Sequence, residues 1–584
     1  MSKPPAAGPA DWRFPRRVAY VVNHSLPYSS DGYAVRSHEV ARALSEQGHE
    51  VLVINRPGRP WDIEGFDPST RVASSQVIDG IRYLFLPSRA LPETGLRPRL
   101  RLAERVLMEV FEVFRPGAVI GVSNWENAEP AMNAARRWGA PFFYEQRGFW
   151  EMSSAASDPD QAASDDYRRA QENDARIAQS ARAVFTLNPQ MKAELAARGV
   201  PESRIHVVAN GVRMPGRIPR GPSRADLGIR ARHLLGYVGS LAAYEGSEDL
   251  PDMLARLRAA GTDADLLVVG SSAPKGLVGG ADTAPPEAFA RAVERHGMSD
   301  HIHFTGQIPY AAVGSYYTLL DAMVMTRRRS AVAEMVTPMK PYAAAAYGLP
   351  VFLPDMAPLD TVASDIHASL YPPGDMEALA GLLRETLEKG GHPAVMNALR
   401  PAVQWTRRVL PMARQLRSAT DDIPDPSRIF APAAETGPLA ETAEAQPGGR
   451  FDRSILPQVA LRRETGTTTI AALGPCRELA DSARLIRLTR TSILGALATR
   501  DVGRFVIDWA GLQDDPGEWA GLWSIDNMRL NRLVMDACAI AQDRGWQLQV
   551  NGPVSRSRAP LFRTVSSLLE EIRLADSPAE GSAA

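Results

Sequence analysis

Short apolar runs alternate with helical patterns through the first part of the chain. Residues 17–24, RVAYVVNH, are mostly apolar, as is typical of a strand buried on both faces. A polar loop that contains Gly32 follows, and residues 36–50 then carry apolar positions along one helical side. This alternation continues to about residue 210. It predicts a parallel sheet covered by helices on both faces, and we assign residues 12–216 to this domain.

The alternation stops and then restarts. A segment rich in Pro, Gly and Arg, residues 215–222, is typical of a connection between domains. Beyond it, strand and helix patterns follow one another again, which predicts a second Rossmann-like domain over residues 217–420. Small molecules bind preferentially where two domains meet, so we expect a cleft between these two domains.

The composition changes after the second domain. Residues 421–455 are rich in Pro, Ala, Glu and Thr and almost lack large apolar side chains, which predicts a flexible linker. Apolar patterns return over residues 456–575 and predict a smaller α/β domain, with a helix expected over residues 477–499. Residues 1–11 and 576–584 are predicted to be disordered tails.

Length and composition are typical of a folded protein with several domains. The chain has 584 residues, too many for one hydrophobic core, and 45% of them are hydrophobic and 23% charged. The formal net charge is −1, so we expect no nucleic-acid partner. Two cysteines, Cys476 and Cys538, cannot form a disulfide framework in so long a chain, which favours a reducing cytoplasm.

Hydropathy favours the same compartment. No apolar run approaches the roughly 20 residues that a membrane-spanning helix needs. The first residues, MSKPPAAGPADWRFPRR, lack the apolar core of a secretory signal. We therefore expect a cytoplasmic protein, and local basic patches leave peripheral contact with the inner membrane open.

The stretch from Met323 to Pro354 carries the strongest candidate chemistry. After the end of a buried strand, its loop brings together cationic, acidic and polar residues: Arg327, Arg328, Arg329, Glu334, Thr337, Pro338 and Lys340. A helix is predicted from Pro341 to about Tyr347, and Gly348 ends it. Free N–H groups at the helix start and the surrounding cations favour a phosphate or diphosphate ligand. On these residues alone, a solvated basic loop before an ordinary crossover helix is equally consistent.

Several stretches, in a fixed order, carry a resemblance to a known family. They are SLPYSSDGYAVRSHEVARALSEQGHEV (25–51), YEQRGFWE (144–151), RIHVVANGV (204–212), GYVGSLAAYEGSEDL (236–250) and VAEMVTPMKPYAAAAYGLPV (332–351). Together they resemble the retaining family 4 glycosyltransferases of the GT-B fold, over roughly residues 17–420. The resemblance implies an α/β protein with two tandem Rossmann-like domains, to which the smaller C-terminal α/β domain is added.

The resemblance also implies an activity and its substrates. The second domain would hold a nucleotide-sugar donor. The first would hold a saccharide or lipid-linked acceptor used in the synthesis of cell-surface polysaccharide or another glycoconjugate. Members of this kind retain the anomeric configuration and need no metal or other cofactor. A helix dipole and basic side chains would stabilise the leaving diphosphate.

Candidate site residues follow from the same resemblance, position by position. The donor-binding candidates are Gly32, Gly239, Ser240, Ile308, Arg327, Arg329, Glu334, Thr337 and Lys340. An ordinary turn is the alternative for each glycine. The catalytic candidates, facing the acceptor or the reacting sugar, are Glu145, Arg147 and Glu151; on chemistry alone they are as consistent with a surface salt-bridge set. We expect His24 and His38 to be structural or merely exposed.

Two positions depart from the family pattern. The glutamate that holds the ribose hydroxyls in the family is replaced by Ala343, whose side chain accepts no hydrogen bond. The Arg–Lys pair that often grips the diphosphate corresponds to the neighbourhood of Ser240 and Glu245, although a subgroup with the sequence YEG lacks that pair too. We therefore keep a second hypothesis, a non-catalytic GT-B scaffold or regulatory partner subunit. A sugar-nucleotide epimerase is a third reading, for which the sequence places no carboxylates and histidine in the cleft.

The smaller domain carries an acidic cluster. Asp508, Asp514, Asp515 and Glu518 lie close together in the sequence. Clustered carboxylates can bind a metal, but their spacing matches no EF-hand loop, so we expect a solvated acidic turn and no metal. We assign this domain no chemistry, and a protein or membrane partner bound through residues 456–575 stays a hypothesis.

Overall fold

The computed structural model covers the predicted tandem domains almost completely. It describes residues 13–67, 69–86, 95–216, 218, 220–272, 274–278, 285–390, 399, 401–423, 469–476, 485–499, 502–520, 522 and 528–551. The predicted tails 1–11 and 576–584, and nearly all of the predicted linker 421–455, lie outside the described residues. The chain divides into two compact units, and the larger one comprises Val18–Arg105 and Ala118–Ala419.

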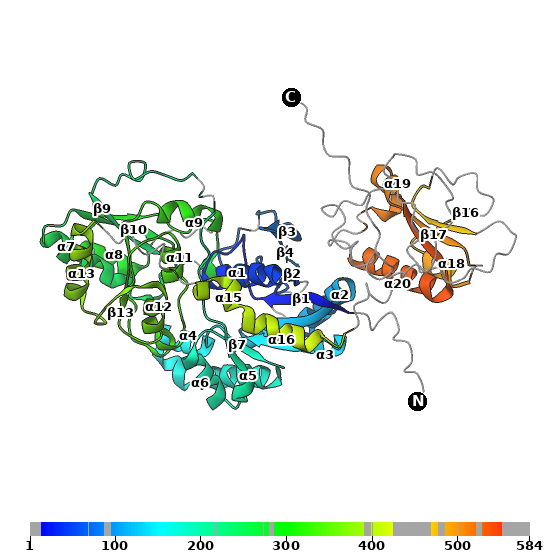
Figure 1. Ribbon diagram of the computed structural model, residues 1–584, viewed down its shortest axis with the longest axis horizontal. Helices are drawn as coiled ribbons and strands as arrows, with labels where there is room; N and C mark the ends of the chain where they lie inside the picture. The colour runs from blue at the N-terminus through cyan, green and yellow to red at the C-terminus, as the bar shows by residue number, and fades with distance from the viewer. Residues whose placement is uncertain are drawn as a thin grey trace, which may run out of the picture. The chain divides into compact units, whose positions relative to one another are not determined.

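The first domain is built on an eight-stranded sheet with the order β3-β4-β2-β1-β5-β6-β7-β8. Strand β4 pairs parallel to β2, the strands from β5 to β8 are parallel, and β3 forms an antiparallel edge hairpin with β4. The elements, labelled in Figure 1, are β1 (Phe14–Val22), α1 (Gly32–Glu46), β2 (Glu50–Asn55), β3 (Ser75–Ile78), β4 (Ile81–Leu84), α2 (Leu96–Phe114), β5 (Pro116–Val122), α3 (Trp125–Trp138), β6 (Phe142–Glu145), α4 (Trp150–Ser157), α5 (Asp165–Ser180), β7 (Val184–Thr186), α6 (Pro189–Ala197) and β8 (Ile205–Val207). The predicted alternation of strands and helices is confirmed.

The second domain repeats the plan with a six-stranded sheet, in the order β11-β10-β9-β12-β13-β14. Every pair in it is parallel. Its elements are β9 (His233–Val238), α7 (Leu250–Ala259), β10 (Ala264–Val269), α8 (Glu287–His296), β11 (Ile302–Phe304), α9 (Tyr310–Tyr317), β12 (Ala322–Val324), α10 (Ala331–Met335), α11 (Lys340–Ala346), β13 (Val351–Pro354), α12 (Leu359–Ile366), β14 (Ser369–Tyr371) and α13 (Met376–Glu388). The helix predicted after Lys340 is therefore α11, and Gly348, at φ +76°, follows its end.

Local signals in the sequence set several element boundaries next to the cleft. The Asp31 carboxylate accepts a hydrogen bond from the Ala34 amide at 2.9 Å and so begins α1. Asn188 begins α6 in the same way, with the Met191 amide 2.8 Å away. Strands β5 and β6 are buried at every position, which explains their continuous apolar runs.

After the second domain the chain returns to the first. Helices α15 (Trp405–Arg408) and α16 (Leu410–Thr420) place their apolar side chains in the core that also contains β1 and α1. Figure 1 shows this segment, in yellow-green, beside α1. The return ties both domains into one unit. Neither of these helices, nor any other in the described part of the chain, is long and apolar enough to cross a membrane.

The C-terminal domain contains a four-stranded parallel sheet with the order β16-β15-β17-β18. Its elements are β15 (Ile470–Leu473), β16 (Leu485–Arg487), α18 (Ile493–Thr499), β17 (Arg504–Asp508), α19 (Trp509–Asp514), α20 (Met528–Arg544) and β18 (Gln547–Asn551). The helix predicted over residues 477–499 is wrong in its centre, because residues 485–487 pair with β15. A short apolar run does not by itself distinguish a strand from a helix.

Candidate functional site

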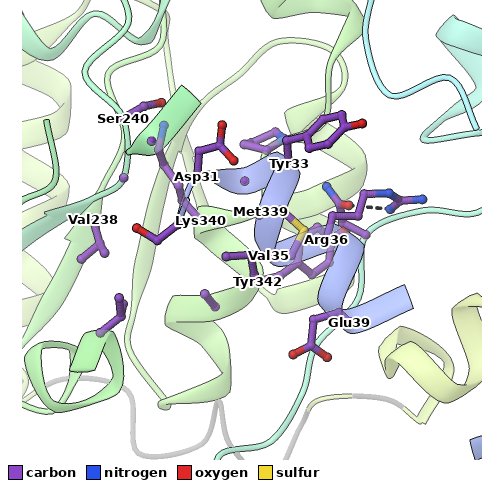
Figure 2. Close-up of a pocket in the computed structure, with 18 of the residues that line it drawn as sticks. Asp31, Tyr33, Val35, Arg36, Glu39, Val238, Ser240, Met339, Lys340 and Tyr342 are labelled. Carbon is purple, nitrogen blue, oxygen red and sulfur yellow. Dashed lines mark hydrogen bonds between the residues drawn. The ribbon is translucent and has the colours of Figure 1, made fainter. Parts of the chain in front are cut away.

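A cavity of about 620 Å³ lies between the two domains of the larger unit. Figure 2 shows Asp31, Tyr33 and Arg36 of the first domain and Val238, Ser240 and Lys340 of the second around it. The predicted site residues that line it are Gly32, Arg147, Gly239, Ser240, Ile308, Arg327, Thr337 and Lys340. The predicted residues outside its lining are Glu145, Glu151, Arg329 and Glu334. The expected cleft is therefore present, and it brings together most of the donor-side candidates.

Direct hydrogen bonds join the two domains at the cavity wall. The Asn188 side-chain amide donates to the Met335 carbonyl at 2.7 Å and lies 2.8 Å from the Thr337 hydroxyl. On another side, Gln307 Nε2 donates to Ser30 Oγ at 2.6 Å. Loops from both sheets thus fix each other across the cleft, and the lining has a defined geometry.

Two cations on the second-domain wall share one carboxylate. Arg327 Nη2 lies 2.8 Å and Lys340 Nζ 2.9 Å from the same Oε1 atom of Glu245. Burial favours the neutral form of Glu245, but the charges of Arg327 and Lys340 outweigh it and hold its pKa at about 2. The three side chains therefore carry one net positive charge at the wall of the cavity.

The other two arginines of the basic stretch do not reach the cavity. Arg328 pairs with Asp249 at 2.6 Å, and Arg329 pairs with Glu334 at 2.9 Å, where both side chains are exposed. The expected arrangement of three arginines around the start of α11 is therefore wrong for two of them. Successive side chains of a non-helical segment point in different directions, and here only Arg327 points inward.

Packing distinguishes the two predicted loop glycines. Gly239 has a φ of +141°, which side chains rarely allow, and a Cβ there would lie 2.2 Å from Lys340 Cε. Gly239 therefore makes room for the lysine. A Cβ on Gly32 would touch only Met339 Cγ, at an ordinary 3.8 Å. The structure thus requires a glycine at position 239 and tolerates a small side chain at position 32.

Glu145 is an anchor beneath the cavity. Its carboxylate is fully buried and accepts from Arg36 Nε at 2.9 Å, Arg147 Nη2 at 2.8 Å and the Tyr20 hydroxyl at 2.5 Å. Burial opposes its ionisation, but the two guanidinium groups outweigh it and hold the pKa of Glu145 at about 2. Arg36 and Arg147 line the cavity. Glu145 therefore orients two lining side chains but does not itself line the cavity.

Glu151 belongs to a different place. It is buried, its carboxylate lies 2.7 Å from Arg198 Nη1, and it lines a second cavity of the first domain. The sequence alone grouped it with Glu145 and Arg147 because the three lie within one short segment. Glu145 ends β6 and Glu151 lies on α4, and the turn between these elements separates them.

Two protein-family models match the chain, one over each domain that borders the cavity. The model described as "Glycosyl transferase 4-like domain" matches residues 31–211, and "Glycosyl transferases group 1" matches residues 232–389. Together they cover more than half of the chain, one model on each domain of the cleft. The chain belongs to the GT-B glycosyltransferases.

Individual relatives of this chain are distant. A 2-deoxystreptamine N-acetyl-D-glucosaminyltransferase from Streptomyces fradiae is 34% identical over 163 residues, 26% of this chain and 34% of that protein. A 2-deoxystreptamine glucosyltransferase from Streptomyces kanamyceticus is 29% identical over 237 residues, 38% of this chain and 55% of that protein. The chain thus spans between a third and about half of the length of these relatives. Among solved structures, the sucrose-phosphate synthase from Thermosynechococcus elongatus is 18% identical, with a TM-score of 0.49, over 70% of this chain and 94% of that one.

One of the two departures expected from the sequence lies inside the cavity. Ala343, the position that the resemblance compares with a glutamate, lines it and presents only a methyl group. Glu245 lines the same cavity, and its second oxygen, Oε2, is buried with no hydrogen-bond partner among the described residues. A carboxylate is therefore present on this wall, but it comes from a different loop.

The sequence missed a polar pair in the same cavity. His24 and Asp31 both line it, and His24 Nε2 lies 2.9 Å from the Asp31 carboxylate. Burial lowers the pKa of His24, although the Asp31 carboxylate beside it opposes the shift. The only feature of the sequence that pointed to His24 was its position after the first strand, at the sheet edge where such folds bind ligands. His38 is buried outside the lining, and its Nδ1 lies 2.7 Å from the Tyr83 hydroxyl, so it is not exposed.

The acidic cluster of the C-terminal domain separates into two parts. Asp508 is buried and accepts backbone hydrogen bonds from Cys476 at 2.6 Å and Gly511 at 3.1 Å. Asp514, Asp515 and Glu518 are exposed. Within the described residues, no group of three or more His, Cys, Asp or Glu side chains is arranged to hold a metal ion. Asp508 therefore serves the turn after β17.

Proposed function

We propose that this chain transfers a sugar from a nucleotide-sugar donor to an acceptor, with retention of the anomeric configuration. The observation that carries the proposal is the position of Arg327 and Lys340 together on one wall of the inter-domain cavity. An incoming diphosphate would take over the hydrogen bonds that both cations now make to Glu245. Preorganised cations at the leaving diphosphate are a large source of stabilisation in group transfer.

Side chains, more than the helix dipole, would stabilise the leaving group. Helix α11 has only seven residues, and its first residue is Lys340 itself. The charge that a divalent metal would supply comes in this proposal from Arg327 and Lys340, so transfer requires no metal. The donor would lie against the second domain, with Gly239, Ser240 and Thr337 offering backbone and hydroxyl groups.

The acceptor in this proposal is a saccharide or a lipid-linked saccharide, used in the synthesis of a cell-surface polysaccharide or another glycoconjugate. The names of the two curated relatives point instead to an aminocyclitol, 2-deoxystreptamine. We place the reaction in the cytoplasm, and the C-terminal domain would provide contact with a protein partner or the inner membrane.

A non-catalytic scaffold is the second candidate, and two observations favour it. Ala343 offers no acceptor for ribose hydroxyls, and Glu245 already occupies both cations of the donor wall. Loss of hydrogen bonds to a charged group weakens binding by roughly 1.5–3 kcal/mol, about 10- to 150-fold. Such a chain would keep the fold of the cleft and act through a protein partner.

Calorimetry against a panel of nucleotides and nucleotide sugars separates the two candidates. We expect micromolar binding of at least one UDP- or GDP-sugar, weakened about tenfold or more in Lys340→Ala. Lys389→Ala is the matched control, because Lys389 is exposed and pairs only locally with Glu385. If no nucleotide or nucleotide sugar of the panel binds and a pull-down finds a tight protein partner, the scaffold is supported.

A further inference from the structure

A second cavity, of about 730 Å³, lies in the larger unit beside the first. First-domain residues line it, except for Lys275 from a second-domain loop. Lys275 and Trp150 line both cavities, so the two adjoin at these side chains. Its volume falls in the range of small-molecule sites, enough for a sugar with a substituent.

Cations gather on one wall of this cavity. Arg56 and Arg59 both pair with a single carboxylate, that of Asp62, and Arg59 Nη1 lies 2.7 Å from it. Lys275 Nζ lies 4.0 Å above the Trp150 ring and has no ion-pair partner among the described residues. Asp62 itself is not in the lining, so a ligand in the cavity would contact the cations and not their counter-ion.

The cations of this wall repel one another. Burial lowers the pKa of Arg59 to about 10, and Arg56 adds to this effect. Burial also lowers the pKa of Lys275, and Arg59 is the next largest cause; attraction to Asp31 and Glu126 does not restore it. A bound anion would relieve both the desolvation and the repulsion.

Most of the remaining acids and cations of the lining are paired with each other or with neighbouring side chains. Glu151 pairs with Arg198, Arg169 with Asp166, and Arg97 with Glu129. Among the described residues, Glu126 is the lining carboxylate near the cationic wall that forms no ion pair. Trp125 and Trp150 add aromatic surface, which suits the C–H face of a sugar ring.

We propose that this cavity holds the acceptor and that the acceptor is a saccharide carrying a phosphate group. The proposal rests on the proposed function, since it names the acceptor class of that reaction. The phosphate would lie against Arg56, Arg59 and Lys275, and the sugar between the tryptophans, with a hydroxyl directed past Trp150 towards the donor cavity. The phosphate belongs either to a soluble sugar phosphate or to a lipid-linked saccharide. A diamine such as 2-deoxystreptamine would be repelled by this wall.

Binding to the full chain without any donor tests the site. By calorimetry, N-acetylglucosamine 1-phosphate should bind at least tenfold more tightly than N-acetylglucosamine, and cationic glucosamine most weakly. Lys275→Gln and Arg56→Gln should each remove most of the preference for phosphate. Arg169→Gln is the matched control, because Arg169 lines the same cavity with its charge compensated by Asp166.

A second arm distinguishes the source of the phosphate. Phosphatidylcholine vesicles with and without a prenyl phosphate are sedimented with the chain and with Lys275→Gln. Capture only by the prenyl phosphate vesicles, lost in Lys275→Gln, supports the site with a lipid-linked acceptor. Phosphate-selective binding of the soluble sugar supports it with a soluble acceptor.

Several results would overturn the proposal. They are equal affinity for the neutral and the phosphorylated sugar with no capture by prenyl phosphate vesicles, a preference for glucosamine, or an equal loss in Arg169→Gln. If no nucleotide or nucleotide sugar binds but the phosphorylated sugar is still preferred, the proposed transfer is contradicted and the anion site is supported. If a nucleotide sugar binds but the phosphorylated sugar is not preferred, the proposed transfer is supported and the anion site is contradicted.

Discussion

At the scale of single residues, paired charges set what the main cavity offers to a ligand. Arg36 and Arg147 are held by Glu145, and Arg327 and Lys340 by Glu245. Each carboxylate keeps its cations in place, and each also competes with an incoming anion. Because these partners lie far apart along the chain, 109 positions for Arg36 and Glu145, no local pattern predicts them.

A glutamate placed at position 343 tests whether the expected departure there limits nucleotide binding. In Ala343→Glu, a carboxylate enters the cavity at the position that the resemblance compares with a glutamate. We expect nucleotide affinity to rise about 10- to 100-fold, because hydrogen bonds to a charged group are stronger than those to water-exposed neutral groups. Calorimetry with the best nucleotide of the panel measures it. Ala343→Gln is the control of equal size, and an equal gain there would contradict a role for the charge.

The pH dependence of stability reports on the buried Glu145 anchor. The folded carboxylate has a pKa of about 2, whereas an unfolded glutamate binds its proton near pH 4.3. Its contribution is therefore complete above about pH 5 and is lost as the pH falls from there towards 2. We expect Glu145→Gln to lower the free energy of unfolding by about 3 kcal/mol at pH 7, from urea denaturation, and by about half as much near pH 3.

Glu385→Gln provides the comparison for that pH series. Glu385 is exposed and pairs only with Lys389 on its own helix. Its replacement should change stability little at any pH. A Glu145→Gln effect that stays constant from pH 7 to pH 3 would contradict the ion-pair account.

At the scale of elements, strand ends and the loops after them build the site. Gly239 follows β9, Arg327 follows β12, and Lys340 begins α11, so one edge of the second sheet assembles the second-domain wall of the cavity. The spacing of hydrophobic residues predicted most of these elements, because a buried parallel strand and an amphipathic helix have different patterns. It failed for β16, where only three residues pair with β15.

The loop after β9 should not tolerate a side chain. In Gly239→Ala, the new Cβ meets Lys340 and the backbone is strained, so we expect lower stability and lower nucleotide affinity together. Thermal unfolding and calorimetry measure the two effects, and a stability loss of about 1–3 kcal/mol is expected. Gly381→Ala is the control: Gly381 lies in α13 with open space around its Cβ position, and alanine should stabilise the helix slightly. An unchanged Gly239→Ala variant would contradict the packing of Lys340.

At the scale of the larger unit, the two domains act as one because their loops bond directly and α15 and α16 return to the first domain. The tandem arrangement was predictable, since the strand and helix pattern restarts after a Pro- and Gly-rich break. The hydrogen bonds across the cleft were not, because they depend on how two folded surfaces meet.

Asn188 tests this coupling between the domains. Asn188→Asp keeps the acceptor that begins α6 but replaces the donor to Met335 and Thr337 with a carboxylate. We expect a stability loss of about 1–3 kcal/mol and faster hydrogen exchange over residues 335–340, measured by mass spectrometry. Ser164→Ala, which removes only the cap of α5, should leave exchange in that segment unchanged. Equal exchange in both variants would argue against the link.

The sequence by itself determined the alternation of strands and helices, the two tandem domains and the stretch that supplies Lys340, because periodicity and turn residues act locally. Tertiary structure alone decided that Arg327 points inward while Arg329 pairs with Glu334 at the surface. It also decided that Glu145 supports the cavity from below and that Lys275 joins two cavities. These outcomes depend on side-chain direction and on partners from distant segments, which only the folded chain brings within a few ångströms.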